Sequence, residues 1–238
     1  MSAIRRPLAG PARPLLVWLV LVGACSSCAA ASRVSDDSDA VEPGDCEIET
    51  TFERRRARGA AAERESAVQI ACGIGWKTEL TATFASRANG AERDRGFGLE
   101  GKTSLNESTA GNVGWALAYG VGTERSRAGP WQPADFFLAL EGTWRPASAW
   151  RVEARVGTAR DRLARSDSTT WTLAAERTLG ESFEARAELI GDDRSRPWTG
   201  VTLRWRIWPE HAVLSLSGGV RAGPLRERRA GLGLTFEF

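Results

Sequence analysis

Apolar and polar residues alternate one by one along most of the chain, from Cys46 to the terminal Phe238. Successive side chains of a β-strand point to opposite faces, so this period of two predicts strands. The fold class is therefore expected to be all-β with about twelve strands, or ten if the first or the eleventh does not span. The predicted strands are residues 46–54, 66–74, 76–86, 97–105, 112–122, 135–145, 150–156, 170–176, 183–189, 201–207, 213–217 and 229–238.

The first two predicted strands have the register of a hairpin centred on Gly59. In that register Ile48 faces Ile70 and Cys46 faces Cys72. Directly opposed Cβ atoms lie about 4.5–5.5 Å apart, near the range that a disulfide spans. We expect Cys46 and Cys72 to form a disulfide, and the alternative is a pair of free cysteines facing lipid.

One face of the predicted strands is charged, and the other is apolar with aromatic side chains near both strand ends. Short linkers near 75, 146–149, 179–182 and 209–211 alternate with longer charged ones at 54–64, 87–95, 125–133, 159–167 and 192–197. The aromatics near short linkers are Trp76, Trp144, Trp150, Phe183 and Phe238, and those near longer linkers are Phe84, Phe97, Tyr119, Phe136 and Trp171. A soluble sandwich or lipocalin-like barrel would turn its apolar face inward. Lipid outside and charge inside explain both features, which predicts a transmembrane up-and-down antiparallel β-barrel.

An apolar run at residues 15–22 follows Arg5, Arg6 and Arg13 and precedes a stretch of small residues. The run is shorter than the roughly 20 apolar residues of a spanning helix. The order of basic, apolar and small residues is that of a secretory signal peptide. We expect residues 1–31 to be that signal, cleaved near Ala31. A lipoprotein signal that leaves Cys25 lipidated is the alternative.

The segment 32–45 is polar and acidic, and it predicts a flexible periplasmic lead-in rather than a domain. The barrel then occupies residues 46–238. Export also favours the Cys46–Cys72 disulfide, because the periplasm is oxidising.

The composition argues against several functions and adds no candidate site. The 32 basic and 30 acidic side chains give a formal charge of +2 and are interleaved, so no basic stripe indicates nucleic-acid binding. A hydrophobic content of 42% with a mean hydropathy of −0.30 fits a barrel in which only alternate residues face lipid. The chain has one histidine and no Cys/His cluster with metal-ligand spacing, so neither a metal nor a cofactor is expected.

The chain ends on Leu234-Thr235-Phe236-Glu237-Phe238, with apolar residues at every second position. This segment resembles the closing strand of Gram-negative outer-membrane β-barrel proteins, and the alternation from Cys46 onward is similar to theirs. The resemblance implies an outer-membrane location, a periplasmic N-terminus and assembly by the barrel-assembly machinery. Leu234, Phe236 and Phe238 would be the assembly signal. The resemblance implies no substrate.

The charged face would line the lumen, where the two signs nearly balance and where Lys77 is one of the inward positions. A candidate arginine track consists of Arg151, Arg155, Arg186, Arg204 and Arg206. Rings of arginine favour anions. One hypothesis is a narrow monomeric channel for small polar or anionic solutes, similar to the monomeric barrels that admit acidic sugars. The alternative is a non-conducting structural or surface-interaction barrel with a salt-bridged lumen and functional loops.

An enzyme is not expected. Twelve-stranded outer-membrane phospholipases use a histidine with a serine two residues later, whereas His211 is followed by Ala212 and Val213. His211 also lies in a predicted periplasmic turn, on the wrong side for attacking lipid of the outer leaflet. Outer-membrane proteases use acidic and histidine residues near the outer rim, and the chain has no second histidine. No catalytic residue is assigned.

Arginines also gather in the predicted linkers, at Arg54, Arg55, Arg56 and Arg58 and around 125–127 and 192–196. Arginine pairs well with phosphate, so these linkers are candidates for binding lipopolysaccharide or a surface partner. Solvated loop faces are the alternative. The expected partners are outer-membrane lipid, lipopolysaccharide and the assembly machinery, with no nucleic acid.

Overall fold

The alternating sequence forms antiparallel strands throughout the computed structural model, which describes residues 38–127, 129–209, 211–223 and 226–238. The predicted signal peptide, with both alternatives for its processing, lies outside these residues. The strands are β1 (Cys46–Arg56), β2 (Glu63–Gly75), β3 (Thr78–Asn89), β4 (Glu92–Asn106), β5 (Val113–Ser126), β6 (Gln132–Ala147), β7 (Trp150–Asp161), β8 (Ser166–Thr178), β9 (Phe183–Asp192), β10 (Trp198–Trp208), β11 (Ala212–Arg221) and β12 (Glu227–Glu237).

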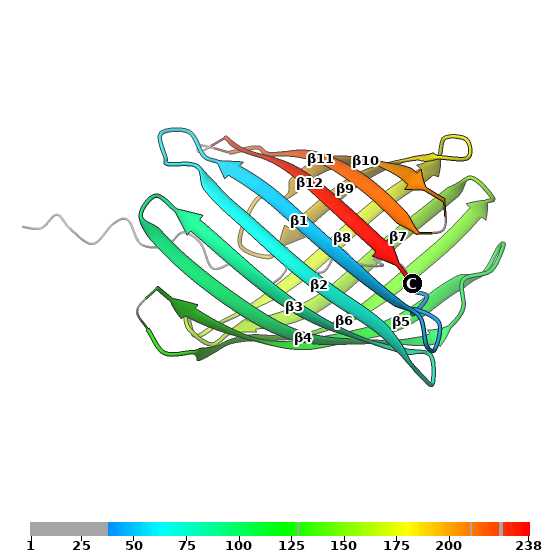
Figure 1. Cartoon of the computed structure of the whole chain (residues 1–238), viewed down its shortest axis with the longest axis horizontal. Coiled ribbons are helices and arrows are strands. Elements are labelled where there is room, and N and C mark those ends of the chain that lie inside the picture. The colour runs from blue at the N-terminus through cyan, green and yellow to red at the C-terminus, as the bar shows by residue number, and fades with distance from the viewer. Residues whose placement is uncertain (1–37, 128, 210, 224–225) are drawn as a thin grey trace, which may run out of the picture.

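Each strand pairs with its neighbour in sequence, and β12 pairs with β1, so the sheet closes into a barrel (Figure 1). Closure supplies a partner for the backbone groups of both end strands, which lipid could not provide. Both strands that were in doubt, β1 and β11, belong to the barrel, so the count is twelve rather than ten. Over the described ranges, no helix is long and apolar enough to cross a membrane.

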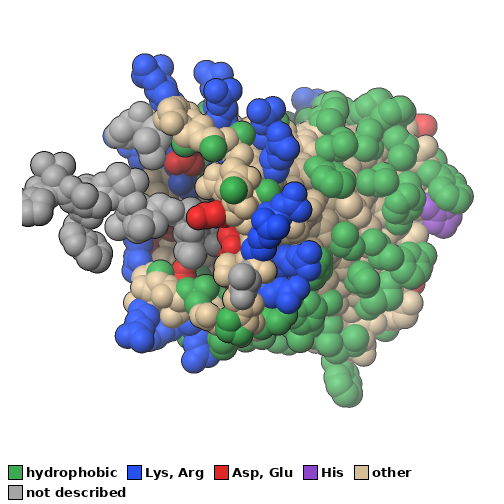
Figure 2. Space-filling view, turned by 60° about the vertical axis from the view of Figure 1, so that its left-hand side comes forward, with side chains coloured by type: hydrophobic (Ala, Val, Ile, Leu, Met, Phe, Trp, Pro, Cys, Tyr) green, Lys and Arg blue, Asp and Glu red, His purple; other side chains and the backbone are tan. Residues whose placement is uncertain are grey.

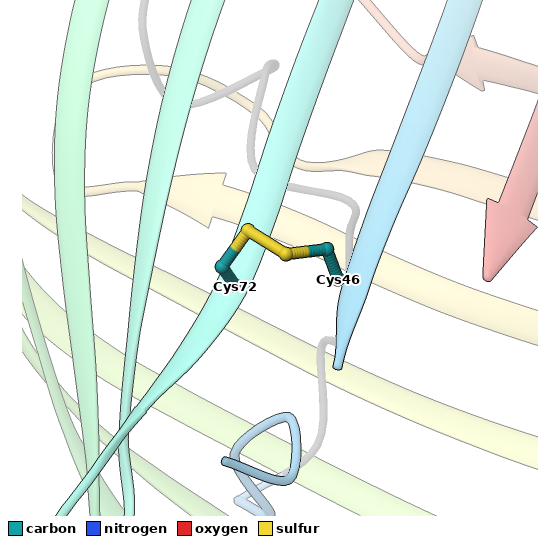
Figure 3. The surroundings of a disulfide bond; sticks show 2 residues. All are labelled: Cys46 and Cys72. Carbon is teal, nitrogen blue, oxygen red and sulfur yellow. A yellow bond between two sulfur atoms is a disulfide. The ribbon is translucent and has the colours of Figure 1, made fainter. Parts of the chain in front are cut away.

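The first hairpin has the predicted register. Ile48 faces Ile70 and Cys46 faces Cys72, with a Cα–Cα distance of 4.2 Å between the two cysteines. They form a disulfide that joins the start of β1 to β2 (Figure 3). The predicted bridge is confirmed, and it follows from a register that the apolar residues set independently.

The wall of the barrel is inverted relative to a soluble protein. Large apolar side chains such as Phe52, Leu99 and Leu138 are exposed on the outside, while Lys102, Glu141 and Glu153 are buried on the inside. Figure 2 shows the hydrophobic side chains gathered in a broad band on one face of the molecule. This apolar belt is the surface that a membrane barrel presents to lipid.

The barrel has two ends, which are named here by their connections. The terminal end holds Cys46, Phe238 and the connections that follow β2, β4, β6, β8 and β10. The distal end holds the connections that follow β1, β3, β5, β7, β9 and β11. The contrast between short and long connections is smaller than predicted, because strands extend into four of the five predicted long linkers, while 193–197 is a connection almost as predicted. Beyond the apolar belt the outward residues are polar as well as the inward ones. The strands therefore continue there without the apolar–polar alternation from which they were predicted.

The turn between β2 and β3 also differs from the prediction. Trp76 and Lys77 have φ values of +50° and +55° and form a two-residue turn, whereas the sequence placed them in the strand. Such turns need positive φ at both central residues and usually contain Asn or Gly, so their usual signal is missing here. Lys77 therefore does not face the lumen. Its Nζ lies 3.0 Å from Glu107 Oε1 at the exposed terminal end.

The inverted wall predicts opposite outcomes for one added charge on its two faces. Leu216 points outward from β11 between Leu203 and Leu232. We expect Leu216→Arg to reduce the free energy of unfolding in phospholipid bilayers by about 2–4 kcal/mol. Ser215→Arg places the same charge on the inner face near the Glu49 carboxylate, and it should cost clearly less. Urea titration followed by tryptophan fluorescence measures both, and equal losses would contradict the assignment of faces.

Candidate functional site: the charged lumen

The five arginines of the predicted track line one side of the lumen. Arg151 and Arg155 lie on β7, Arg186 on β9, and Arg204 and Arg206 on β10. The strands β7 to β10 are consecutive neighbours in the barrel, so residues of one parity on them share the inner face. The five arginines therefore share the inner face of this part of the wall.

The inner arginines meet a matching set of glutamates. Arg186 Nη1 lies 2.5 Å from Glu153 Oε2, and Arg151 Nε lies 2.8 Å from Glu153 Oε1. Arg151 also reaches Glu176 Oε1 at 2.8 Å, and Arg186 reaches Glu188 Oε2 at 3.7 Å. Arg186 and its glutamates are buried, so each charge depends on the others for compensation.

The other three arginines of the track are paired but more accessible. Arg155 Nη1 lies 3.1 Å from Glu141 Oε1, and Arg204 Nη1 lies 3.3 Å from Glu184 Oε2. Arg206 pairs with the same Glu184 carboxylate. The side chains of Arg204 and Arg206 keep 32% and 47% of their surface exposed. The track is thus a lattice of ion pairs whose open positive edge is on β10.

A second inward cluster surrounds Trp198, the first residue of β10. The indole is buried, and the guanidinium carbons of Arg55, Arg221 and Arg229 lie 5.7, 4.8 and 5.2 Å from a ring centroid. Arg229 also donates to Glu188 Oε1 at 2.6 Å. Arginine over an indole face is a favourable cation–π arrangement. The sequence prediction missed this cluster because it placed Trp198 outside strand ten. The parity that Trp198 shares with Arg204 and Arg206 was the available signal.

Residues 38–45 lie against the inner wall at the terminal end. The Ser38 backbone N–H donates to Thr143 Oγ1 at 2.8 Å, and Arg145 Nη2 donates to Asp39 Oδ2 at 3.1 Å. The Val41 N–H donates to Glu79 Oε2 at 3.2 Å. Thr143, Arg145 and Glu79 belong to the inner faces of β6 and β3. This terminal-end strap, residues 38–45, is therefore held in place by the wall.

Two glycines of the inner wall allow the terminal-end strap to approach. A Cβ on Gly73 would lie 2.1 Å from the Glu42 carbonyl oxygen, and one on Gly114 would lie 2.4 Å from Ser38 Oγ. The Gly44 N–H donates to the Gly73 carbonyl at 3.1 Å, which extends the contact along β2. Residues 38–45, which the sequence places in an acidic lead-in, thus have specific contacts with the wall. Asp39 of this segment forms an ion pair with Arg145 inside the barrel.

The single histidine and the groups of acidic residues give no candidate site for catalysis or metal binding among the described residues. His211 lies in the turn between β10 and β11 and packs edge-on against Trp208, with ring centroids 4.8 Å apart. Within the part of the chain that the structure describes, no group of three or more His, Cys, Asp or Glu residues is arranged to hold a metal ion.

The family model described as Uncharacterised conserved protein UCP029691 matches residues 16–208. The chain belongs to this family. No curated protein matches the sequence of this UCP029691 member. Its family is thus shown by sequence, and its fold is shown by comparison with solved structures.

Solved outer-membrane channels share the fold. The KdgM porin in complex with disordered oligogalacturonate has a TM-score of 0.63 at 13% identity, over 81% of this chain and 99% of that one. The NanC porin has a TM-score of 0.57 at 10% identity, covering 79% and 98%. The COG4313 outer membrane channel from Pseudomonas putida F1 has a TM-score of 0.58 at 11% identity, covering 85% and 98%. The UCP029691 member is therefore an outer-membrane-type β-barrel with a porin-like fold.

The ion-pair lattice predicts unequal costs for removing two carboxylates. Glu153 contacts both Arg151 and the buried Arg186, so Glu153→Gln leaves charge in the wall without full compensation. We expect this change to reduce the free energy of unfolding by about 3 kcal/mol. Asp167→Asn breaks only the exposed pair with Arg160, 3.6 Å apart, and should cost less than about 1 kcal/mol. Denaturant unfolding in the same detergent measures the free energy of unfolding of both variants. A loss below about 1 kcal/mol for Glu153→Gln would contradict a stabilising role of the ion-pair lattice.

Proposed function

We propose that this barrel is a narrow monomeric channel for small polar or anionic solutes in the bacterial outer membrane. The observation that carries the proposal is a closed barrel with an apolar outer face and a charged inner face. A charged inner face suits the passage of hydrophilic solutes through a lipid layer. We also propose that the terminal end faces the periplasm and the distal end faces outward, because the chain enters and leaves the barrel at the terminal end.

Two features support a preference for anions. Arg204 and Arg206 present the most exposed guanidinium groups of the lattice, on the side of the terminal end. The structurally similar KdgM porin is described in complex with oligogalacturonate, an acidic ligand, although the identity of 13% carries only the fold. The preference should be weak, because each of these arginines already has a glutamate partner.

The terminal-end strap supports a narrow path rather than an open one. Its contacts with Thr143, Arg145 and Glu79 come from strands β3 and β6, so it crosses part of the mouth at that end. The same contacts favour the second candidate, a non-conducting barrel whose loops carry the function. Conductance decides between them.

Neutralising the open positive edge should lower the anion preference. Arg204→Gln with Arg206→Gln leaves the Glu184 carboxylate without its two partners, so the local charge changes sign. We expect the anion-to-cation permeability ratio in planar bilayers to fall by about twofold or more, measured as a reversal potential in a salt gradient. Arg160→Gln with Arg194→Gln removes the same charge at the distal end and serves as the control. Unchanged selectivity would contradict the role of β10, and a folded but silent wild-type barrel would contradict the channel.

Loosening the terminal-end strap should raise conductance. Asp39→Ala removes the ion pair with Arg145 and the acceptor of the Ser108 N–H. We expect a higher single-channel conductance or more frequent opening than in the wild type. Asp45→Ala removes the same charge from the strap but keeps its backbone hydrogen bond with Gly73, so it should behave like the wild type. Equal traces for all three proteins would contradict a strap that limits the path.

A further inference from the structure

Arginine side chains gather on the outer face of the barrel at its distal end. Figure 2 shows Lys and Arg side chains there, beside the hydrophobic band. From the pairing registers, the outward arginines of β12, β1, β2, β4 and β5 are Arg228, Arg54, Arg56, Arg64, Arg93, Arg95 and Arg125. The sequence had placed several of them in loops, but all seven lie on strands.

These arginines sit immediately beyond the apolar belt. Arg54 follows Phe52 on the outer face of β1, and Arg95 lies next to Phe97 on the outer face of β4. Phe52 and Phe97 are exposed outward at the edge of the belt. Side chains just past this edge reach the headgroups of the lipid layer.

Like charges oppose each other directly across neighbouring strands in this region. The registers pair Arg54 with Arg64, Arg56 with Arg228, and Arg95 with Arg125. Directly opposed like charges destabilise a sheet unless something of opposite charge lies between them. Three such pairs lie on one face, and an anion bound between them would offset their repulsion.

The described part of the chain does not supply such an anion. Among the described residues, the outward positions of β12 and β1 to β5 at the distal end hold no aspartate or glutamate. None of the seven arginines forms an ion pair within the described ranges. Elsewhere the protein pairs such groups, as Arg160 with Asp167 on the outer face of β7 and β8.

Four of the arginines enclose a floor of small residues, which together form the arginine basin. On one side Arg54 faces Arg64 and Arg64 faces Ala88, and on the other side Ala88 faces Arg93. Below them Ser86 lies between Ser66 and Arg95 on the adjacent strands. The basin thus combines two columns of arginine with two serine hydroxyls. Bidentate guanidinium groups and hydroxyl donors are the groups that bind phosphate well.

We infer that the arginine basin binds the phosphate groups of lipopolysaccharide in the outer leaflet. A sugar headgroup that carries phosphates at fixed spacing can engage arginines on both sides of β3 at once, unlike a lipid with a single phosphate. The inference rests on the proposed outward orientation of the distal end. It does not depend on whether the lumen conducts.

The test uses the full chain refolded in a neutral detergent, where binding does not depend on membrane orientation. A short-chain lipopolysaccharide and its enzymatically dephosphorylated form are titrated against the barrel, and affinity is measured by microscale thermophoresis. We expect the phosphorylated form to bind at least about tenfold more tightly than the dephosphorylated form. Phosphatidylglycerol, which has one phosphate, should bind as weakly as the dephosphorylated form.

The basin variant carries Arg54→Gln, Arg64→Gln, Arg93→Gln and Arg95→Gln. Its matched control carries Arg160→Gln, Arg162→Gln, Arg194→Gln and Arg196→Gln, which remove the same charge from the distal ends of other strands and loops. Heat-modifiability on gels checks that both are folded. We expect about a tenfold or greater loss of lipopolysaccharide affinity in the basin variant and less than about twofold in the control.

Three results would overturn the inference. Equal losses in the two variants would mean that overall charge drives binding. Equal affinity for the two forms of lipopolysaccharide would mean that phosphate is not recognised. Equal binding of phosphatidylglycerol would mean that the surface recognises single anionic lipids. A failure of conductance would leave this result unaffected, so the two proposals fail separately.

Discussion

The pairing of β12 with β1 is the constraint on which the rest of the structure depends. A lipid layer offers no water to unpaired backbone groups, so an open sheet edge could not remain in it. The start of β1 meets the residue that follows β12 at this seam, where the N–H groups of Cys46 and Phe238 each donate to the other residue's carbonyl oxygen, at 2.8 and 3.0 Å. Leu234 and Phe236 of the predicted assembly signal lie on β12 and Phe238 follows it directly, so the predicted signal lies at the seam that closes the barrel.

Closure dictates the charge pattern of the wall. Once one face of every strand meets lipid, the charged residues of period-two strands must turn inward, into the lumen. Their cost is offset by pairing, and consecutive strands supply partners in register, as Arg151 and Glu176 on β7 and β8 do. The balance of charges in the lumen is therefore first a condition for folding. Any selectivity must come from groups that this pairing leaves accessible, such as Arg204 and Arg206.

The sequence was informative wherever strand parity and hairpin register decide the outcome. The twelve strands, the two faces, the Cys46–Cys72 disulfide and the grouping of the lumen arginines all follow from these two rules. The sequence was uninformative about contacts between a strand and a segment that has no apolar–polar alternation. The strap depends on Asp39 meeting Arg145, which is 106 residues away, and no short-range pattern records that pairing. The prediction at Trp76 and Lys77 was wrong for a different reason, because Trp and Lys rarely adopt the positive φ values of this turn.

Arginine serves two purposes in this barrel, and its surroundings distinguish them. Inside, Arg186 is buried among Glu153, Glu176 and Glu188, so its charge is neutralised by ion pairs within the wall. Outside, Arg54 and Arg64 oppose each other, and the described residues place no carboxylate beside them on the outer face. A folding constraint explains the first arrangement but works against the second, since a neutral pair at those positions would stabilise the sheet better. The outer arrangement is the basis of the proposed phosphate site, because a headgroup with several phosphates can contact arginines on more than one strand.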